Sequence, residues 1–138
     1  MECAGKICII KIYNWFDVRR LAMRVFVYNL MFNKMGAVVR ACRAIGAEIV
    51  NIDNEDIHKS IEYLVGSSKN AKPGMDCDEN VSELLIFDGF TSDNLDDFLD
   101  AYKGTQAPPV AFKAMVTPVN LKWSPAYLYS HLKGEMGI

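Results

Sequence analysis

Apolar strand segments and amphipathic helix segments alternate along this chain from residue 23 onward, and this alternation constrains the fold more than any other feature. Segments rich in β-branched and aromatic residues lie at 24–30, 47–53, 83–87 and 110–116, each followed by a segment with helical signals. Such alternation with short links predicts a parallel sheet with right-handed crossovers and helices on both faces. We predict an α/β fold: a single domain of four βα units, with a mainly parallel four-stranded sheet in the order 2-1-3-4. A ferredoxin-like split βαβ fold is the alternative, because one antiparallel strand changes the pattern little.

The ends of the predicted helices carry local signals. The first helix, residues 34–45, has its apolar residues at helical spacing, and Gly46 follows it as a left-handed C′ residue. Gly104 is predicted to end the third helix. Asp53 offers a capping oxygen to the second helix. Beyond the strand–helix alternation itself, no internal repeat is evident.

The third and fourth helices also have clear start signals. Thr91 or Ser92 is predicted to cap the third helix. The last helix begins with Ser124 as the cap and Pro125 at its first position, and Trp123 can pack against the first turns as a hydrophobic staple.

Two segments depart from the regular pattern. Residues 1–22 have no clear period, and we predict a loosely ordered extension before a domain that spans residues 23–138. An additional edge strand at residues 7–13 is the competing interpretation. Residues 66–80 form the one long loop, which we expect to be mobile or functional.

Composition limits the class of protein. The chain has 138 residues, a net charge of −2 and four scattered cysteines, which fits one globular domain with free thiols in a reducing compartment. We predict a cytoplasmic protein, because no segment approaches the length of a membrane helix or an export signal. Residues 44–102 hold fourteen acidic residues against three lysines. Nucleic acid is therefore not expected as a partner, and neither is a membrane.

Residues 83–135 carry a more specific pattern. An apolar strand ends in Asp88-Gly89-Phe90, a second ends in the run from Lys113 to Thr117, and Asn120, Trp123 and Glu135 follow. This pattern resembles a bacterial domain family of unknown function, family 3783. The resemblance implies the α/β fold and supplies no catalytic residues, and residues 23–65 share only its layout.

Several polar residues near the strand ends are candidates for a metal site or a binding site. Asp53 and Asp88 resemble the acidic pair of a magnesium site, although helix capping is the favoured interpretation. Lys113 lies in an otherwise apolar strand, on the face opposite Phe112 and Ala114. It indicates either a site or a sheet edge protected by a charge, and we favour the edge.

Two classes of function follow. We predict a non-catalytic binding or regulatory module for an unknown protein or small molecule, with no cofactor, metal or catalytic residues. The alternative is a small enzyme or phosphate-ligand site that uses Lys113, Thr117, Asn120 and an acid such as Asp88. The binding surface is predicted at the turns after the third and fourth strands, where helix amides and aromatic side chains gather. Its candidate residues are Asp88, Gly89, Phe90, Lys113, Thr117, Asn120 and Trp123.

Overall fold

The computed structural model describes residues 22–137, so the predicted extension, apart from Ala22, lies outside the described residues. The strands and helices follow in the predicted order. Their bounds are β1 Arg24–Tyr28, α2 Phe32–Ile45, β2 Glu48–Asn51, η1 Asn54–His58, α3 Ile61–Leu64, β3 Leu84–Asp88, α4 Ser92–Gly104, β4 Lys113–Met115, η2 Asn120–Lys122 and α5 Pro125–Glu135.

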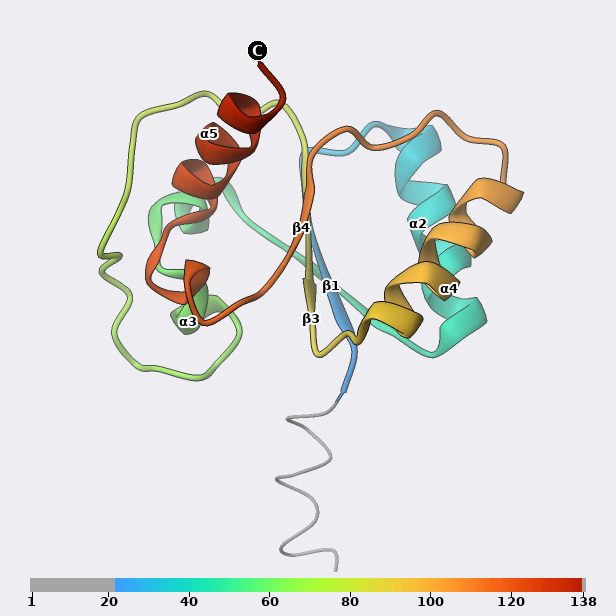
Figure 1. Cartoon of the computed structure of the whole chain (residues 1–138), viewed down its shortest axis with the longest axis horizontal. Coiled ribbons are helices and arrows are strands. Elements are labelled where there is room, and N and C mark those ends of the chain that lie inside the picture. Colours follow the sequence, from blue (N-terminus) through green and yellow to red (C-terminus); the bar gives the residue numbers. More distant parts are fainter. Residues whose placement is uncertain (1–21, 138) are drawn as a thin grey trace, which may run out of the picture.

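The predicted strand order is confirmed: the four strands lie in the order β2-β1-β3-β4. β1 and β2 are parallel, and so are β3 and β4. The two central strands, β1 and β3, are antiparallel, so the sheet is mixed. Figure 1 shows the sheet nearly edge-on between two helical layers, with α2 and α4 on one face and α3 and α5 on the other.

The two halves of the chain have the same arrangement, a structural repeat of the strand–helix alternation that the sequence shows. Each half runs strand, long helix, strand, 3-10 turn and shorter helix. The long helices α2 and α4 pack on each other, while α3 contacts η2 and α5 contacts η1. With antiparallel central strands, a half-turn about an axis normal to the sheet exchanges the halves. The fold is therefore a pseudo-two-fold pair of βαβα units.

Equivalent positions in the two halves share unusual backbone conformations. The residue after β1 is Asn29, with φ 58°, and the residue after β3 is Gly89, with φ 77°. Gly46 after α2 has φ 77°, and Gln106 after α4 has φ 65°. These left-handed residues end a strand and a helix at matching places, so the backbone repeats although the side chains differ.

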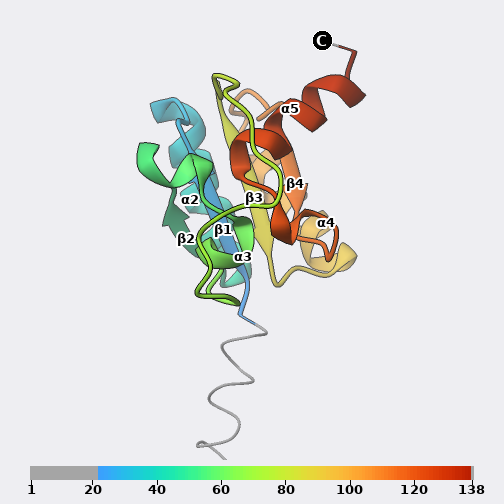
Figure 2. The ribbon, with the colours of Figure 1, turned by 90° about the vertical axis from the view of Figure 1, so that its left-hand side faces the viewer.

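The starts of the short helices repeat as well. Ser60 caps α3 by accepting a hydrogen bond from the Tyr63 amide at 3.2 Å. Ser124 caps α5 by accepting one from the Tyr127 amide at 3.1 Å. Both serines are fully buried, and each is the first residue of a Ser-x-x-Tyr-Leu sequence. Figure 2, turned to face this layer, shows α3 and α5 over the sheet.

The core consists of two apolar clusters, one on each face of the sheet. One joins α2 and α4 to the sheet through Val25, Phe87 and Phe98. The other lies beneath α3 and α5 around Phe26 and Ile86. The alternation of side chains along each strand sends successive residues to opposite clusters, so the sheet is buried on both faces.

Several local predictions are confirmed. Gly46 adopts the left-handed conformation after α2, and its amide donates to the Cys42 carbonyl. Thr91 caps α4 in a capping box with Asn94. Ser124 and Pro125 start α5 as expected.

Gly104 is the last residue of α4, as predicted, and the left-handed residue that turns the chain after it is Gln106. Other local predictions are corrected. Asp53 makes no capping hydrogen bond to η1. The first helix starts at Phe32 rather than at Lys34, and the strand predicted over residues 110–116 is ladder-paired only from Lys113 to Met115.

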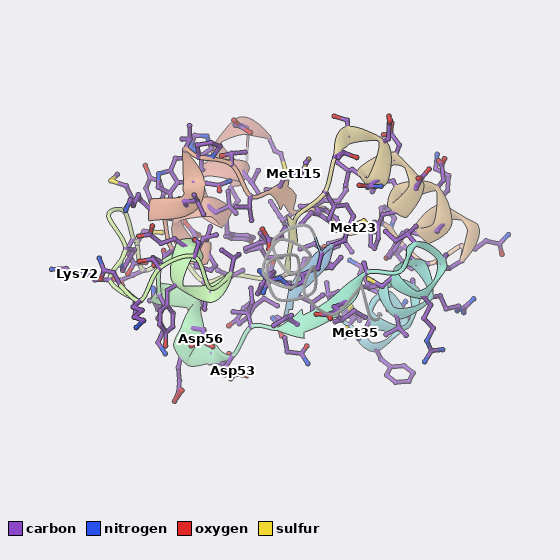
Figure 3. All side chains as sticks on the ribbon, turned by 90° about the horizontal axis from the view of Figure 1, so that it is seen from below. Met23, Met35, Asp53, Asp56, Lys72 and Met115 are labelled. Atoms are coloured by element: carbon purple, nitrogen blue, oxygen red, sulfur yellow. The ribbon has the colours of Figure 1, made fainter. Side chains whose placement is uncertain are left out.

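The long loop is tied to the body of the protein. The Gly74 amide donates to the Lys122 carbonyl at 2.6 Å, and the Ser124 amide donates to the Met75 carbonyl at 2.9 Å. Asp76 accepts hydrogen bonds from Ser124 Oγ at 2.5 Å and at 3.0 Å from His58 Nδ1. These bonds fix residues 74–76 against the start of α5, whereas Lys72 projects outward from the same loop in Figure 3.

Candidate functional site

The polar residues that follow the strands lie at two opposite ends of the sheet. Because β1 and β2 run antiparallel to β3 and β4, the carboxyl end of β2 and the carboxyl end of β3 lie at opposite ends of the sheet. Asp53 and Asp88 therefore lie at opposite ends, and the two do not form an acidic pair. Figure 3, which views the sheet from one edge, shows Asp53 well away from Met115 at the end of β4.

The turn after β3 is packed and paired. Asp88 Oδ2 accepts a hydrogen bond from Arg24 at 2.6 Å, within an ion pair that is about four-fifths buried on the Asp88 side. A Cβ placed on Gly89 would lie 2.4 Å from the Ala22 carbonyl oxygen. Phe90 is only 8% exposed and packs edge-on against Phe87, with ring centroids 5.1 Å apart. The predicted surface aromatic is therefore a core residue.

The loop after β4 is closed by Asn120. Asn120 Oδ1 accepts a hydrogen bond from the Thr117 amide at 2.9 Å, and its Nδ2 donates to the Met115 carbonyl at 2.9 Å. The Asn120 amide in turn donates to Thr117 Oγ1 at 3.2 Å. Asn120 is buried, and these bonds engage its side-chain oxygen and nitrogen. This geometry organises the loop.

Trp123 is half-buried at the start of α5. Its ring centroid lies 5.0 Å from the Tyr127 ring and 5.0 Å from the His131 ring. The indole also packs against the core cluster beneath α3 and α5. These contacts place Trp123 as a packing residue at the rim of that cluster.

Lys113 lies apart from the other candidates. It begins β4, the edge strand, and its Nζ donates to the Val110 carbonyl at 2.8 Å. Thr117 follows four residues later, which is about 13 Å along an extended strand. Lys113 therefore does not converge with Asp88, Thr117 and Asn120, and the four groups do not share one site.

Lys113 instead lines a pocket of about 510 Å³ between α4, β4 and the loop that joins them. In Figure 1 this loop arches from the end of α4 back to the sheet. The size falls within the usual range for small-ligand sites. The apolar walls come from β3, from α4 and from the loop, and consist of Leu85, Phe98, Leu99, Tyr102, Ala107, Pro109 and Val110.

The pseudo-two-fold axis explains why a pocket occurs in this half. Gly46 and Ala47 alone separate α2 from β2, whereas residues 105–112 separate α4 from β4. The longer connection crosses the space beside the sheet edge instead of closing directly onto it. The paired residues also differ between the two halves: Val25 on β1 pairs with Ile49 on β2, whereas the equivalent Leu85 on β3 pairs with Lys113 on β4. A partly buried core isoleucine is thus replaced by an exposed lysine.

The polar lining of the pocket is cationic. Lys103, Gln106 and Lys113 are its hydrophilic residues besides Tyr102, and all three are exposed. None of the lining residues is an acid, although the outer face of α4 presents Asp93, Asp96, Asp97 and Asp100. The pocket thus offers apolar walls and two ammonium groups.

Tyr102 fixes the loop over the pocket. Its hydroxyl donates to the Pro108 carbonyl at 2.6 Å, which ties the loop to α4. Burial raises the pKa of the Tyr102 phenol, and the nearby Glu83 carboxylate raises it further. The phenol is therefore a proton-bearing structural donor at neutral pH.

The sequence predicted only part of the pocket lining. Lys113 was recognised as unusual in an apolar strand, and its predicted face is confirmed, because Met115 packs in one cluster and Ala114 in the other. Lys103 was missed, because a lysine in the last turn of a helix is ordinary. The available signal was the stretched link between the third helix and its strand, with Pro108-Pro109 inside it.

A cluster of Ser124, Asp76 and His58 lies outside this pocket. Asp76 stands between the other two and accepts from both. In a nucleophilic triad the histidine would instead lie between serine and acid. Ser124 is also completely buried and caps α5, so this cluster anchors the 66–80 loop.

One comparison with known proteins gives a match to part of the chain. Searches of curated proteins and of solved structures gave no match. Across residues 22–137, no helix has both the length and the apolar character needed to cross a membrane. Residues 83–136, which span β3 to α5, match the family model of a domain of unknown function, DUF3783, as the sequence pattern predicted.

Proposed function

We propose that this chain is a non-catalytic binding module that takes a small, largely apolar molecule into the pocket between α4 and β4. The observation that carries this proposal is the pocket itself: about 510 Å³ with apolar walls. Apolar walls with a few placed polar groups are typical of ligand sites.

The comparison of the two halves supports the same proposal. An apolar surface that stays open at the edge of a small fold lacks the stabilisation that burial gives, and the first half has this burial. The first half places Ile49 against its core, whereas the second half holds Lys113 at the same position and a long loop above it. A ligand that fills the space would restore the missing burial.

Binding rather than catalysis fits the pocket lining. The lining contains no carboxylate, histidine, cysteine or serine. The groups of the enzyme alternative are separated, because Asp88 is paired with Arg24 and Asn120 is occupied by its own loop. We also propose a cytoplasmic location, which the free thiols of Cys42 and Cys77 support.

A titration with 1-decanol, followed by amide chemical shifts of the full chain, tests the proposal. We expect shifts concentrated on residues 98–113. Leu99→Asp should abolish them, because Leu99 forms a wall of the pocket. Val39→Asp is the matched control, because Val39 is the half-buried residue at the equivalent position of α2 and does not line the pocket. Shifts that survive Leu99→Asp, or that centre on another part of the fold, would contradict the proposal.

A further inference from the structure

The pocket has a charge preference that its apolar walls alone do not provide. Lys103 reaches it from the last turn of α4, and Lys113 reaches it from the start of β4. The two lysines come from different elements and meet at one pocket. Within residues 22–137, neither ammonium group forms an ion pair with a carboxylate.

The absence of acids from the lining matters because acids are common around it. The outer face of α4 is strongly acidic, and the chain as a whole is slightly acidic. The Glu83 carboxylate contacts the loop: Lys34 lies 2.8 Å from one of its oxygens, and the Ala111 amide donates to the other at 2.9 Å. Lys34 partly offsets the Glu83 charge, although the carboxylate still raises the pKa of the Tyr102 phenol. Lys103 and Lys113 are left as the charged groups of the lining, and Lys113 Nζ also donates to the Val110 carbonyl.

We infer that the ligand is an amphipathic carboxylate, with an apolar body in the pocket and its carboxylate between Lys103 and Lys113. This inference rests on the proposed function and names the class of ligand for the same pocket. The seven apolar lining residues receive the hydrocarbon part. The two oxygens of a carboxylate can each accept from one ammonium group, as charge-assisted hydrogen bonds.

Gln106 adds a third donor at the same rim. Its backbone has φ 65°, and it lines the pocket where α4 passes into the loop. Its amide group can donate to the same carboxylate without adding charge. The polar rim is thus built from donors, while the Tyr102 hydroxyl is committed to the Pro108 carbonyl.

The test compares sodium decanoate with 1-decanol on the full chain by isothermal calorimetry, below the concentration at which either associates with itself. We expect decanoate to bind about tenfold more tightly than decanol at low salt, because two partly exposed ion pairs together contribute on this order. The difference should shrink at high ionic strength, because salt screens exposed charges. Decanol binding should not respond to salt.

The double variant Lys103→Gln/Lys113→Gln should remove the preference for decanoate, so that decanoate and decanol bind with equal affinity. Lys69→Gln/Lys72→Gln is the matched control, because it removes the same charge from exposed lysines of the 66–80 loop. We expect that control to leave both affinities unchanged.

The outcomes separate the two proposals. Equal binding of decanoate and decanol by the wild type, with no effect of the pocket variant, would refute the carboxylate and keep the binding module. Equal losses of decanoate binding in both double variants would also refute it, because the attraction would then follow net charge rather than the pocket. Binding of neither probe by the wild type would refute the binding module itself.

Discussion

Replacing Gly89 with alanine probes the closest backbone approach that any described glycine makes. Gly89 follows β3 with φ 77°, a conformation that disfavours any residue with a Cβ. An added Cβ would also lie 2.4 Å from the Ala22 carbonyl oxygen and 3.1 Å from its carbonyl carbon. Both contacts are with main-chain atoms, which a side-chain rotation does not relieve.

The magnitude follows from comparison with Gly46. Gly46 has the same φ of 77°, but a Cβ there meets no atom within 4 Å. Gly46→Ala should therefore show only the conformational cost, roughly 1–2 kcal/mol. Gly89→Ala should add the cost of overpacking against a backbone, typically about 1–3 kcal/mol. We expect Gly89→Ala to be the more destabilising by that added amount.

Urea unfolding followed by circular dichroism measures both variants, with the midpoint compared at constant slope. The same substitutions are then made in a chain that begins at Met23, which lacks Ala22. We expect that shorter chain to keep the thermal midpoint of the full chain. In it, Gly89→Ala should cost no more than Gly46→Ala, because the clashing atoms are gone.

Two results would overturn this reasoning. If Gly89→Ala and Gly46→Ala cost the same in the full chain, the close approach of Ala22 has no energetic weight. If Gly89→Ala costs more than Gly46→Ala by the same margin in both chains, the excess arises from the turn itself and not from Ala22.

Three further predictions concern single side chains. Ser60→Ala and Ser124→Ala should each lower stability by ~1 kcal/mol in urea unfolding, with the larger loss for Ser124, because Ser124 Oγ donates to a charged carboxylate whereas Ser60 Oγ donates to the neutral Asn70 carbonyl; equal losses would contradict the charge-assisted contribution of the Ser124 bond. Burial raises the pKa of Asp76, but hydrogen bonds from Ser124 and His58 outweigh it, so the net pKa is lowered. The contribution of Asp76 to the free energy of unfolding should be full above pH ~4 and lost as pH falls through the lowered pKa. Asp76→Asn should remove this acid dependence of the unfolding midpoint. Burial raises the pKa of Cys42 to about 11, so native protein at pH 8 should alkylate at Cys77 well before Cys42, and mass spectrometry of the modified peptides checks this.

The sequence allowed prediction of the features that depend on local signals. A helix cap or a C′ glycine bonds to backbone groups only a few residues away, so a short sequence pattern predicts it. The roles predicted for Thr91, Ser124 and Gly46 at the helix ends are confirmed. Strand order also followed from the pattern, because short links keep each strand beside its helix. Burial of the Cys42 thiol followed from its place on the apolar face of α2.

The direction of β3 was not accessible in the same way. β3 is buried on both faces, and an apolar strand of this kind has the same composition in either direction. The connection that decides its direction is the irregular 66–80 loop, which carries no periodic signal. The direction of β3 also decides the less favoured magnesium interpretation, because a pair of Asp53 and Asp88 would require both carboxyl ends at the same end of the sheet.

The internal repeat was hidden because the two halves preserve backbone conformation rather than side chains. Asn29 and Gly89 share a left-handed backbone, and so do Gly46 and Gln106, yet each pair differs in residue type. The longest match by residue is the Ser-x-x-Tyr-Leu segment, which begins at Ser60 in one half and at Ser124 in the other. The family model covers the second half alone, and the first half supplies the complementary surface.

Departures from the two-fold arrangement therefore distinguish what the fold requires from what it does not. The capping serines and left-handed turns occur in both halves, so packing alone accounts for them. Lys113 occurs in one half, at a position where Ile49 shows that an apolar side chain fits. Full burial of an isoleucine contributes about 1.5–3 kcal/mol, and a half-buried one roughly half of that. A lysine on the edge strand β4 also blocks edge-to-edge pairing. The long loop above it has no such explanation, so the loop together with Lys113 supports the pocket as the proposed ligand site.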